Sequence, residues 1–329
     1  MTAHDQFYLF GTPISHSLSP TFHNTAFAAL SLTSYRFLLH ETPSFSYDAS
    51  VAALLNSPTL GGASVTMPHK IEALSLVHEL AEEVKEVGSL NTIVRLEEGR
   101  LKGRNTDVDG IREALLSTLP EEKRREKAPW GEGRSAFVIG GGGTTRAAIS
   151  ALSQLSLSPI YLLNRDRLET ASIISSPSFA TYDLRPLDDA VLDSWTEDDA
   201  RKIACAVGAI PSFEPETEGE KMVYRCAGRV FEWTGRMEGE RPLMEMPYKP
   251  HRTLMYALAE QHGWRSIGGI EALVRMAEVQ LRAWLPHPPS SSASASLQQA
   301  TEQEEWEEKL RRAVEKAAEA VRAAAGASA

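Results

Sequence analysis

Four clusters of polar residues in the first 110 positions carry side chains suited to binding a small, oxygen-rich molecule. They are Ser15-His16-Ser17-Leu18-Ser19-Pro20, Ser64-Val65-Thr66-Met67-Pro68-His69-Lys70, Gly88-Ser89-Leu90-Asn91-Thr92 and Asn105-Thr106-Asp107. Together they supply hydroxyls, amides, one lysine and one aspartate, most of them beside an apolar run. In open α/β sheets, the carboxyl ends of the strands form the ligand crevice. These donors and acceptors would suit a polyhydroxylated, anionic molecule.

A second pattern has the order that a dinucleotide site needs: a strand, glycines and a helix. A buried-strand run over residues 136–139 leads directly into four glycines, and residues 144–157 predict a helix. Glycine allows the backbone to approach a pyrophosphate, and a helix N-terminus offers N–H donors. Gly140 and Gly142 match the first two positions of GxGxxG, Gly143 leads into the helix, and Thr145 replaces the third glycine. The loop alone also fits other α/β proteins.

The residues that follow the next predicted strand, 160–163, bear on the choice of cofactor. Asn164, Arg165 and Asp166 stand about 20 residues after the loop, where a Rossmann fold reads the adenosine ribose. Asp166 could accept from both ribose hydroxyls, which favours NAD. Arg165 or Arg167 could instead pair with a 2′-phosphate, which favours NADP. Both cofactors stay open, with the balance toward NAD, and an exposed loop of mixed charge is the plainer alternative.

These residues need a scaffold, and the chain predicts alternating strands and helices. Strands are expected over 7–10, 35–39 and 63–66, a helix over 21–30, and a hairpin with arms at 91–94 and from 100, joined by a turn at 97–99. A further strand is expected over 203–207, and two helical patterns lie between residues 254 and 284. Such alternation predicts an α/β fold with largely parallel sheets.

Changes in composition predict the domain boundaries. Residues 119–135 hold many charges with Pro and Gly, as exposed connections do. We therefore expect an α/β substrate-binding domain over 1–118, a Rossmann-type doubly wound domain over 119–267, and a helix over 268–285 that completes the first domain. Residues 286–329 predict a linker and a charged helix, which Thr301 and Glu304 would open with a capping box.

Composition excludes several classes of protein. The chain has 329 residues, 42% of them hydrophobic, and no apolar stretch approaches the ~20 residues of a membrane helix. A net charge of −10 argues against nucleic-acid binding. The N-terminus lacks signal-peptide features, and Cys205 and Cys226 lack metal or disulfide-scaffold spacing, so a cytoplasmic protein is expected. The histidines are interpreted as local hydrogen-bonding residues, with no metal site: His16, His23 and His69.

The motifs, taken together, resemble the shikimate/quinate dehydrogenase family over residues 6–285. The segments that carry the resemblance are GTPISHSLSPTFHN, GASVTMPHK, GSLNT, NTDVDG, VIGGGGTTRAA, LLNRD, MPYKP and GGIEALV. The segments GASVTMPHK and EMPYKP are more similar to those of the quinate-utilising branch than to those of the bacterial shikimate biosynthetic branch. The resemblance implies an NAD(P)-dependent dehydrogenase, with the active site between an N-terminal α/β domain and a Rossmann domain.

The resemblance also implies roles for individual residues. The substrate carboxylate would meet Ser17 and Ser19, and the ring hydroxyls would meet Thr66, Lys70, Asn91 and Asp107, with Tyr248 nearby. Lys70 and Asp107 would be the catalytic pair. Chemistry agrees, because an alcohol must lose its proton as hydride leaves, and a lysine oriented by a carboxylate can take that proton. Considered singly, Lys70 would be a solvated helix-start residue and Asp107 a helix cap.

The sequence departs from the family at Met276, where the family has a glutamine that contacts a substrate hydroxyl. A thioether offers neither a donor nor a strong acceptor, and such a loss costs ~1–3 kcal/mol. A less hydroxylated cyclic acid is therefore a hypothesis beside shikimate and quinate. We expect an oxidoreductase that interconverts a ring hydroxyl and a ketone. The alternative is a non-catalytic sensor of the same metabolites, which would not need Lys70 and Asp107. An unrelated Rossmann enzyme would leave the four clusters unexplained. The oligomeric state stays open.

Overall fold

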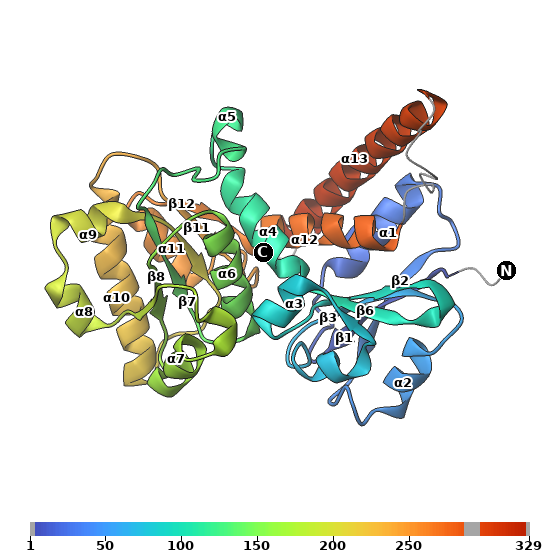
Figure 1. Cartoon of the computed structure of the whole chain (residues 1–329), viewed down its shortest axis with the longest axis horizontal. Coiled ribbons are helices and arrows are strands. Elements are labelled where there is room, and N and C mark those ends of the chain that lie inside the picture. The colour runs from blue at the N-terminus through green and yellow to red at the C-terminus, as the bar shows by residue number, and fades with distance from the viewer. Residues whose placement is uncertain (1–3, 286–296, 327–329) are drawn as a thin grey trace. The chain divides into compact units, whose positions relative to one another are not determined.

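The chain divides into two compact units. The structure, a computed structural model, describes residues 4–285 and 297–326 (Figure 1). The first unit contains residues 1–84, 89–106 and 276–329, and the second contains residues 85–88 and 107–275. The sequence predicts a boundary near residue 119, but the division falls at Asp107. The reason is that Val108, Ile111 and Leu115 of the following helix pack into the core of the second unit.

The first unit contains a six-stranded mixed sheet with the order β2-β1-β3-β5-β6-β4. Its strands are β1 (Gln6–Gly11), β2 (Arg36–Glu41), β3 (Leu60–Val65), β4 (Glu79–Leu80), β5 (Thr92–Arg95) and β6 (Leu101–Arg104). β1 is parallel to β2 and β3, whereas β5 is antiparallel to both β3 and β6. The predicted strands and the predicted hairpin are therefore present, with ends shifted by up to three residues.

This pairing brings four chain segments to one edge of the sheet. β1 and β3 run in the same direction, so both end at that edge. β5 runs the opposite way and starts there, and β6 returns to it. Each of the four polar clusters lies directly after β1, after β3, before β5 or after β6. We call this the substrate edge.

Aromatic residues form the core on one face of this sheet. The ring of Phe7 lies 5.0 Å from that of Phe27 and 5.2 Å from that of Trp284. Trp284 donates its indole N–H to the Ile93 carbonyl at 3.0 Å. It packs so closely on β3 that a Cβ at Gly62 would lie 2.3 Å from the indole nitrogen. Only glycine fits there, and the contact ties the end of α12 (Gly269–Trp284) to the sheet.

The second unit contains a six-stranded parallel sheet with the order β12-β11-β10-β7-β8-β9. Its strands are β7 (Ser135–Ile139), β8 (Ile160–Leu163), β9 (Leu184–Pro186), β10 (Ile203–Gly208), β11 (Pro242–Glu245) and β12 (Arg265–Ile267). Counted from β7, this is the strand order of a dinucleotide-binding Rossmann fold. The predicted α/β class, with a doubly wound sheet, is confirmed. The sequence analysis missed β9, β11 and β12, which are short.

Alternation along β7 shows that both faces of this sheet are covered. Ala136 and Val138 belong to one buried apolar cluster, whereas Phe137 and Ile139 belong to another. Because successive side chains of a strand point to opposite faces, the two clusters lie on opposite sides of the sheet. One contains α6 residues such as Ala147 and Leu152 and the other contains α10 residues such as Val230 and Phe231, which explains why the strand is apolar throughout.

The remaining elements are helical. They are α1 (Ser19–Ala29), α2 (Ala49–Leu55), η1 (Glu72–Leu76), α3 (Glu82–Val87), η2 (Glu97–Gly99), α4 (Thr106–Leu116), α5 (Glu121–Arg124), α6 (Gly143–Gln154), α7 (Arg167–Ile174), η3 (Pro177–Phe179), α8 (Asp189–Ser194), α9 (Glu197–Lys202), α10 (Glu218–Gly235), α11 (Leu254–Gln261), the α12 helix already described and α13 (Leu297–Gly326). α13, red in Figure 1, packs against α1.

One predicted boundary at the C-terminus is wrong. α13 begins at Leu297, so Thr301 lies inside the helix and is not its N-cap. The apolar residues of α13 are buried, including Leu310, Ala317 and Val321. Burial of this face stabilises the helix as a whole, so its start does not depend on a side-chain cap at Thr301. The predicted linker lies largely outside the described residues.

Three further features concern classes of function. Among the described helices, none combines the length and the apolar character needed to span a membrane. The described part of the chain contains no group of three or more His, Cys, Asp or Glu residues that could hold a metal ion. Cys205 and Cys226 are both buried and unbridged.

Candidate active site

Backbone hydrogen bonds at the substrate edge join the polar cluster after β3 to the end of β1 and to the polar cluster before β5. The N–H of Thr12, after β1, donates to the Met67 carbonyl oxygen at 3.2 Å. The N–H of Thr66, after β3, donates to the Phe10 carbonyl oxygen at 2.8 Å. The Leu90 N–H donates to the carbonyl of Lys70 at 2.8 Å. Clusters separated by tens of residues in sequence therefore lie side by side.

The two serines predicted to meet a carboxylate lie at the start of α1. The Ser17 hydroxyl donates to the Ser19 hydroxyl at 3.2 Å and accepts from the Ser19 N–H at 3.2 Å. No side chain caps this helix, whose first turn contains Pro20. Hydroxyls at a helix N-terminus can meet an anion together with the terminal N–H groups.

Thr66 and Lys70 lie in the turn that follows β3. Both are partly buried, and His69 between them is 2% exposed. Thr66 packs directly against Gly11 at the end of β1. A Cβ at Gly11 would lie only 2.3 Å from the Thr66 methyl group, so the close packing depends on glycine. The backbone of this turn is thus held against β1, and its side chains are carried with it.

Asn91 is held at the substrate edge by several side-chain hydrogen bonds. Its Oδ1 accepts from the Thr106 N–H at 2.8 Å and from the Thr92 hydroxyl at 2.8 Å. Its Nδ2 donates to the sulfur of Met276 at 3.3 Å. With an exposed fraction of 2%, Asn91 is buried at this edge. The bonds to Thr92 and Thr106 fix which way the amide faces.

Gln280 is a residue of this site that the sequence analysis missed. Its Nε2 donates to the Thr92 hydroxyl at 2.9 Å, and its Oε1 accepts from His23 Nε2 at 3.1 Å. Burial lowers the pKa of His23 to about 3, so the ring is neutral and carries its proton on Nε2. His23 therefore makes a hydrogen bond, but to a residue far away in sequence rather than a local one. The helical position of Gln280, four residues after Met276, was the available signal.

Asp107 and Tyr248 belong to the second unit. Asp107 lies in the first turn of α4 and is 3% exposed, directly after Thr106, whose N–H binds Asn91. α4 begins at Thr106, so Asp107 is inside the helix and not its cap. Tyr248 is partly buried between β11 and α11. The catalytic pairing of Lys70 with Asp107 stays a prediction.

The glycine loop lies at the carboxyl end of β7, which pairs with both β10 and β8. This is the point where the strand order reverses, and dinucleotides bind at such a point. Gly140 has φ +137°, and a Cβ there would lie 2.9 Å from the Thr145 hydroxyl and 3.1 Å from the Ala209 carbonyl. A Cβ at Gly142 would meet nothing within 4 Å. Thr145, which stands at the third position of the GxGxxG pattern, is fully buried below the loop.

Asn164 and Asp166, which follow β8, make hydrogen bonds to different parts of the adjoining helix. Asp166 caps α7, because its Oδ1 accepts from the N–H groups of Leu168 at 2.8 Å and Glu169 at 3.1 Å. Asn164 donates to Glu169 Oε2 at 2.8 Å. A Cβ at Gly141 would lie 2.0 Å from that same oxygen. Glu169, which the sequence analysis missed, therefore brings a carboxylate against the glycine loop.

The two arginines proposed for a 2′-phosphate both have carboxylate partners. Arg165 pairs with Glu220, and Arg167 pairs with Asp188 at 3.1 Å. Glu220 and Asp188 also serve as capping residues at the starts of α10 and α8. Each guanidinium is thus drawn to the start of a neighbouring helix.

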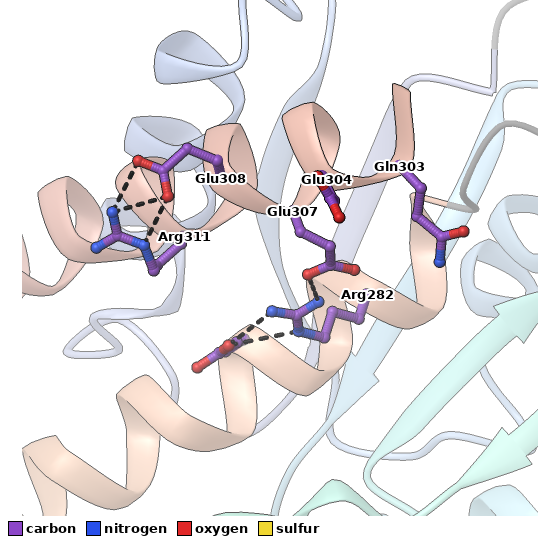
Figure 2. Close-up of a pocket in the computed structure, with 7 residues that line it drawn as sticks. Arg282, Gln303, Glu304, Glu307, Glu308 and Arg311 are labelled. Carbon is purple, nitrogen blue, oxygen red and sulfur yellow. Dashed lines mark hydrogen bonds and ion pairs between the residues drawn. The ribbon is translucent and has the colours of Figure 1, made fainter. Parts of the chain in front are cut away.

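A groove of about 660 Å³ lies between α12 and α13. Figure 2 shows that its charged side chains pair with one another: Arg282 with Glu307 at 2.6 Å, and Arg311 with Glu308 at 2.8 Å. Such pairing supports the packing of the two helices. The groove contains none of the predicted site residues.

Comparison with known proteins bears on the family. Residues 9–93 match the family model described as the shikimate dehydrogenase substrate binding domain. The resemblance to the shikimate dehydrogenase family is confirmed. The matched segment contains Ser17, Ser19, Thr66, Lys70 and Asn91, that is, all the predicted substrate residues of the first unit.

Individual relatives of the shikimate dehydrogenase family extend the similarity beyond that segment. The chain is 33% identical over 285 residues to a pentafunctional AROM polypeptide of Schizosaccharomyces japonicus, covering 85% of this chain and 17% of that protein. The dehydroquinate dehydratase and shikimate dehydrogenase part of S. pombe AroM is 30% identical, with a TM-score of 0.66, covering 85% of this chain and 50% of that one. A shikimate 5-dehydrogenase from Mycobacterium fortuitum is 26% identical, with a TM-score of 0.67, covering 94% and 97%.

The chain spans about a sixth, 17%, of the length of the curated relatives it matches. The two solved structures named above are described as shikimate dehydrogenases, one of them together with a dehydroquinate dehydratase. The quinate-utilising branch that the sequence analysis favoured is not confirmed by these relatives.

Proposed function

We propose that the chain is a nicotinamide-dependent oxidoreductase that interconverts a ring hydroxyl and a ketone on shikimate or a close cyclic hydroxy acid. The observation that carries the proposal is the convergence of the polar clusters at one edge of a sheet. That edge belongs largely to a segment that matches a shikimate dehydrogenase substrate binding domain. The same chain contains a Rossmann sheet with a glycine loop at its switch point.

The chain's own residues would divide the work as follows. Ser17 and Ser19 would bind the substrate carboxylate, as hydroxyls beside helix N–H groups. Thr66, Asn91 and Tyr248 would hold ring hydroxyls. Lys70 would take the proton of the reacting hydroxyl, and Asp107 would orient the ammonium group.

A nicotinamide dinucleotide would be held by the loop of Gly140, Gly142 and Gly143. When bound, it supplies the hydride acceptor or donor of the reaction. The residues fit this group, because a Cβ at Gly142 would meet open space and Gly140 approaches the backbone of Ala209 too closely for any side chain. Thr145, in the position of the third glycine, is buried below the loop and leaves its surface clear.

A matrix of substrates and cofactors tests the proposal. Shikimate and quinate are each offered with NAD and with NADP, and the absorbance of the reduced nicotinamide is followed. We expect turnover with shikimate and at least one cofactor. Tight binding of shikimate without turnover in any combination would contradict the enzyme and favour a sensor. Turnover with quinate alone would move the substrate to the quinate branch.

Within this proposal, we expect NAD to be preferred. Glu169 brings a carboxylate against Gly141, where it could accept from ribose hydroxyls and would repel a 2′-phosphate. Arg165 and Arg167 are engaged by Glu220 and Asp188. Asp166, which the sequence predicts to bind the ribose hydroxyls, uses its Oδ1 to cap α7.

Direct binding of NAD and NADP to the substrate-free protein, measured by calorimetry, tests this preference. Glu169→Gln should weaken NAD binding and strengthen NADP binding, each by about 3- to 10-fold, because the substitution removes one charge near the loop. Asp166→Asn is the matched control, since it removes a charge nearby and keeps a capping side chain. An equal effect of Glu169→Gln on both cofactors would contradict the assignment.

A further inference from the structure

His69 is buried beside Lys70 and makes two hydrogen bonds that the proposed function does not use. Its Nε2 lies 2.8 Å from the carbonyl oxygen of Thr42, and its Nδ1 lies 3.2 Å from Glu72 Oε2. Its ring stacks on Phe45, with ring centroids 5.8 Å apart and an interplanar angle of 29°. A histidine that merely filled the core would not need an acceptor at each end.

Glu72 joins His69 to the loop that follows β2. Its Oε1 accepts from the Ser46 N–H at 2.8 Å, and its Oε2 accepts from the Phe45 N–H at 3.1 Å as well as facing His69. The Ser46 N–H is the largest cause that lowers the pKa of Glu72 to about 2. The carboxylate is therefore ionised near neutral pH and acts only as an acceptor.

The two partners of His69 are both acceptors. A carbonyl oxygen and a carboxylate accept hydrogen bonds, so a ring N–H is what either partner can bind. The side chain spans from the Thr42 carbonyl at one ring nitrogen to the Glu72 carboxylate at the other, with the Phe45 ring stacked beside it.

The loop that receives these bonds is itself braced. The Thr42 hydroxyl lies 2.7 Å from Asp48 Oδ2 and 2.7 Å from the Ser44 carbonyl oxygen, so its single proton can go to either acceptor. Asp48 in turn caps α2 through the Ser50 N–H at 2.8 Å. The Thr42 N–H donates to Gly11 at the end of β1, at 3.2 Å. His69 and Glu72 are thus anchored to a segment tied to both the sheet and α2.

We infer that His69 and Glu72 are positioning residues for Lys70. The backbone of the Lys70 turn is fixed on its other sides, by the bond from the Leu90 N–H to the Lys70 carbonyl and by the bond from the Ala73 N–H to the His69 carbonyl at 2.9 Å. His69 supplies a side-chain anchor directly beside Lys70. A lysine side chain is long and flexible, so holding its backbone in place narrows the positions that its amino group can reach and helps Asp107 to orient it.

The inference rests on the proposed function, and two variants of His69 test it. His69→Leu keeps an apolar side chain of similar size but donates no hydrogen bond. His69→Gln offers an amide with two N–H groups, which can restore donation. We expect kcat to fall about 10- to 100-fold in His69→Leu with KM changed less than about threefold, since a shift of about 1 Å in a reacting group costs this much. His69→Gln should recover most of the loss.

Glu72→Gln keeps the inference testable if His69→Leu fails to fold, because Glu72 is about one-third exposed, at 32%. We expect kcat to fall by about 10-fold, again with little change in KM. Glu97→Gln, at an exposed turn of the same unit, is the control and should leave both constants unchanged.

A readout without turnover separates this inference from the proposed function. Lysines are ¹³C-dimethylated, and the NMR signal of Lys70 is identified by its absence from Lys70→Arg. We expect this signal to sharpen and shift toward the free-lysine position in His69→Leu and Glu72→Gln, and to stay unchanged in Glu97→Gln. An unchanged Lys70 signal in both variants would overturn the inference even if the enzyme were inactive on every substrate offered. Equal loss of kcat in His69→Gln and His69→Leu would also overturn it.

Discussion

The substrate edge and the nucleotide loop are built from contacts of different range. At the substrate edge, Asn91 binds Met276, 185 positions away, and Gln280 binds Thr92, 188 positions away. At the nucleotide loop, Asn164 binds Glu169 five positions away, and Asp166 binds N–H groups two and three positions away. One region depends on tertiary folding of the first unit, whereas the other is a local strand–loop–helix unit.

This difference predicts how the two regions respond to substitution. A change at the substrate edge should affect chemistry while leaving cofactor binding intact, because its contacts lie in another unit of the chain. A change in the loop should affect cofactor binding first. The predictions below set one region against the other, beginning with the largest effect.

Lys70→Ala should lower kcat by about 10²–10⁴, the usual contribution of a positioned general base. Binding of shikimate should persist, since other side chains hold the ring and carboxylate, and NAD binding should not change. Steady-state kinetics and calorimetry with each ligand measure these effects. If Lys70→Ala keeps a kcat within tenfold of the wild type, Lys70 is not the general base. If Lys70→Ala loses NAD binding, the two regions do not act independently.

Glu245, in the second unit, predicts a dependence of the free energy of unfolding on pH. It ends β11 beside Gly208, is 1% exposed, and neither carboxyl oxygen makes a hydrogen bond of normal geometry within the described chain. Burial raises the pKa of Glu245 to about 8, a rise that the Thr253 hydroxyl offsets only in part. Between pH 5 and 8 the unfolded chain releases a proton that the folded chain keeps, so the free energy of unfolding falls as pH rises.

Glu245→Gln should remove this decline, which amounts to at most about 4 kcal/mol across that range at 1.36 kcal/mol per pKa unit. Urea denaturation at pH 5, 6, 7 and 8 measures it. Glu132→Gln, an exposed position of the same unit, is the control and should keep the wild-type slope. A Glu245→Gln protein with the same slope as the wild type would contradict the assignment.

Gly140→Ala and Gly142→Ala form a matched pair within the loop. At Gly140 a methyl group would crowd Thr145 and Ala209, and its φ of +137° suits only glycine. At Gly142 the same methyl group meets nothing within 4 Å. We expect Gly140→Ala to cost about 1–3 kcal/mol of stability and to weaken NAD binding, by denaturation and calorimetry. Gly142→Ala should keep its stability, and similar losses in both variants would mean that the loop is strained as a whole.

The same contrast explains what the sequence could predict. The strand–glycine–helix unit and the hairpin were predictable because their signals are contiguous. A contiguous signal can also have two uses: Asp166, predicted as a cofactor residue, starts a helix, and its Oδ1 caps that helix. Helical spacing places Gln280 on the same face as Met276, but the bond of Gln280 to Thr92 and the contact of Met276 with Asn91 were not predictable, since α12 reaches these residues only through tertiary packing. The short strands β9, β11 and β12 were missed because three or four residues give too little periodicity.

Met276→Gln gives the smallest expected effect and bears most directly on substrate choice. In the wild type, Asn91 donates to a thioether at 3.3 Å, a weak acceptor that satisfies the amide without holding it strongly. A glutamine would accept from Asn91 more strongly and would add a donor for a ring hydroxyl. We expect kcat/KM for shikimate to rise about 5- to 10-fold, which corresponds to roughly 1 kcal/mol for one recovered hydrogen bond.

Met276→Leu is the control, because it keeps an apolar side chain of similar volume and removes only the sulfur contact. It should leave kcat/KM within about twofold of the wild type. If Met276→Gln instead lowers kcat/KM for shikimate and Met276→Leu does not, the thioether is part of a site shaped for a ring with one hydroxyl fewer. The next substrate to offer would then be a cyclic acid that lacks the hydroxyl nearest Asn91. Because Met276 and Asn91 both lie in the first unit, cofactor affinity should be the same in all three proteins.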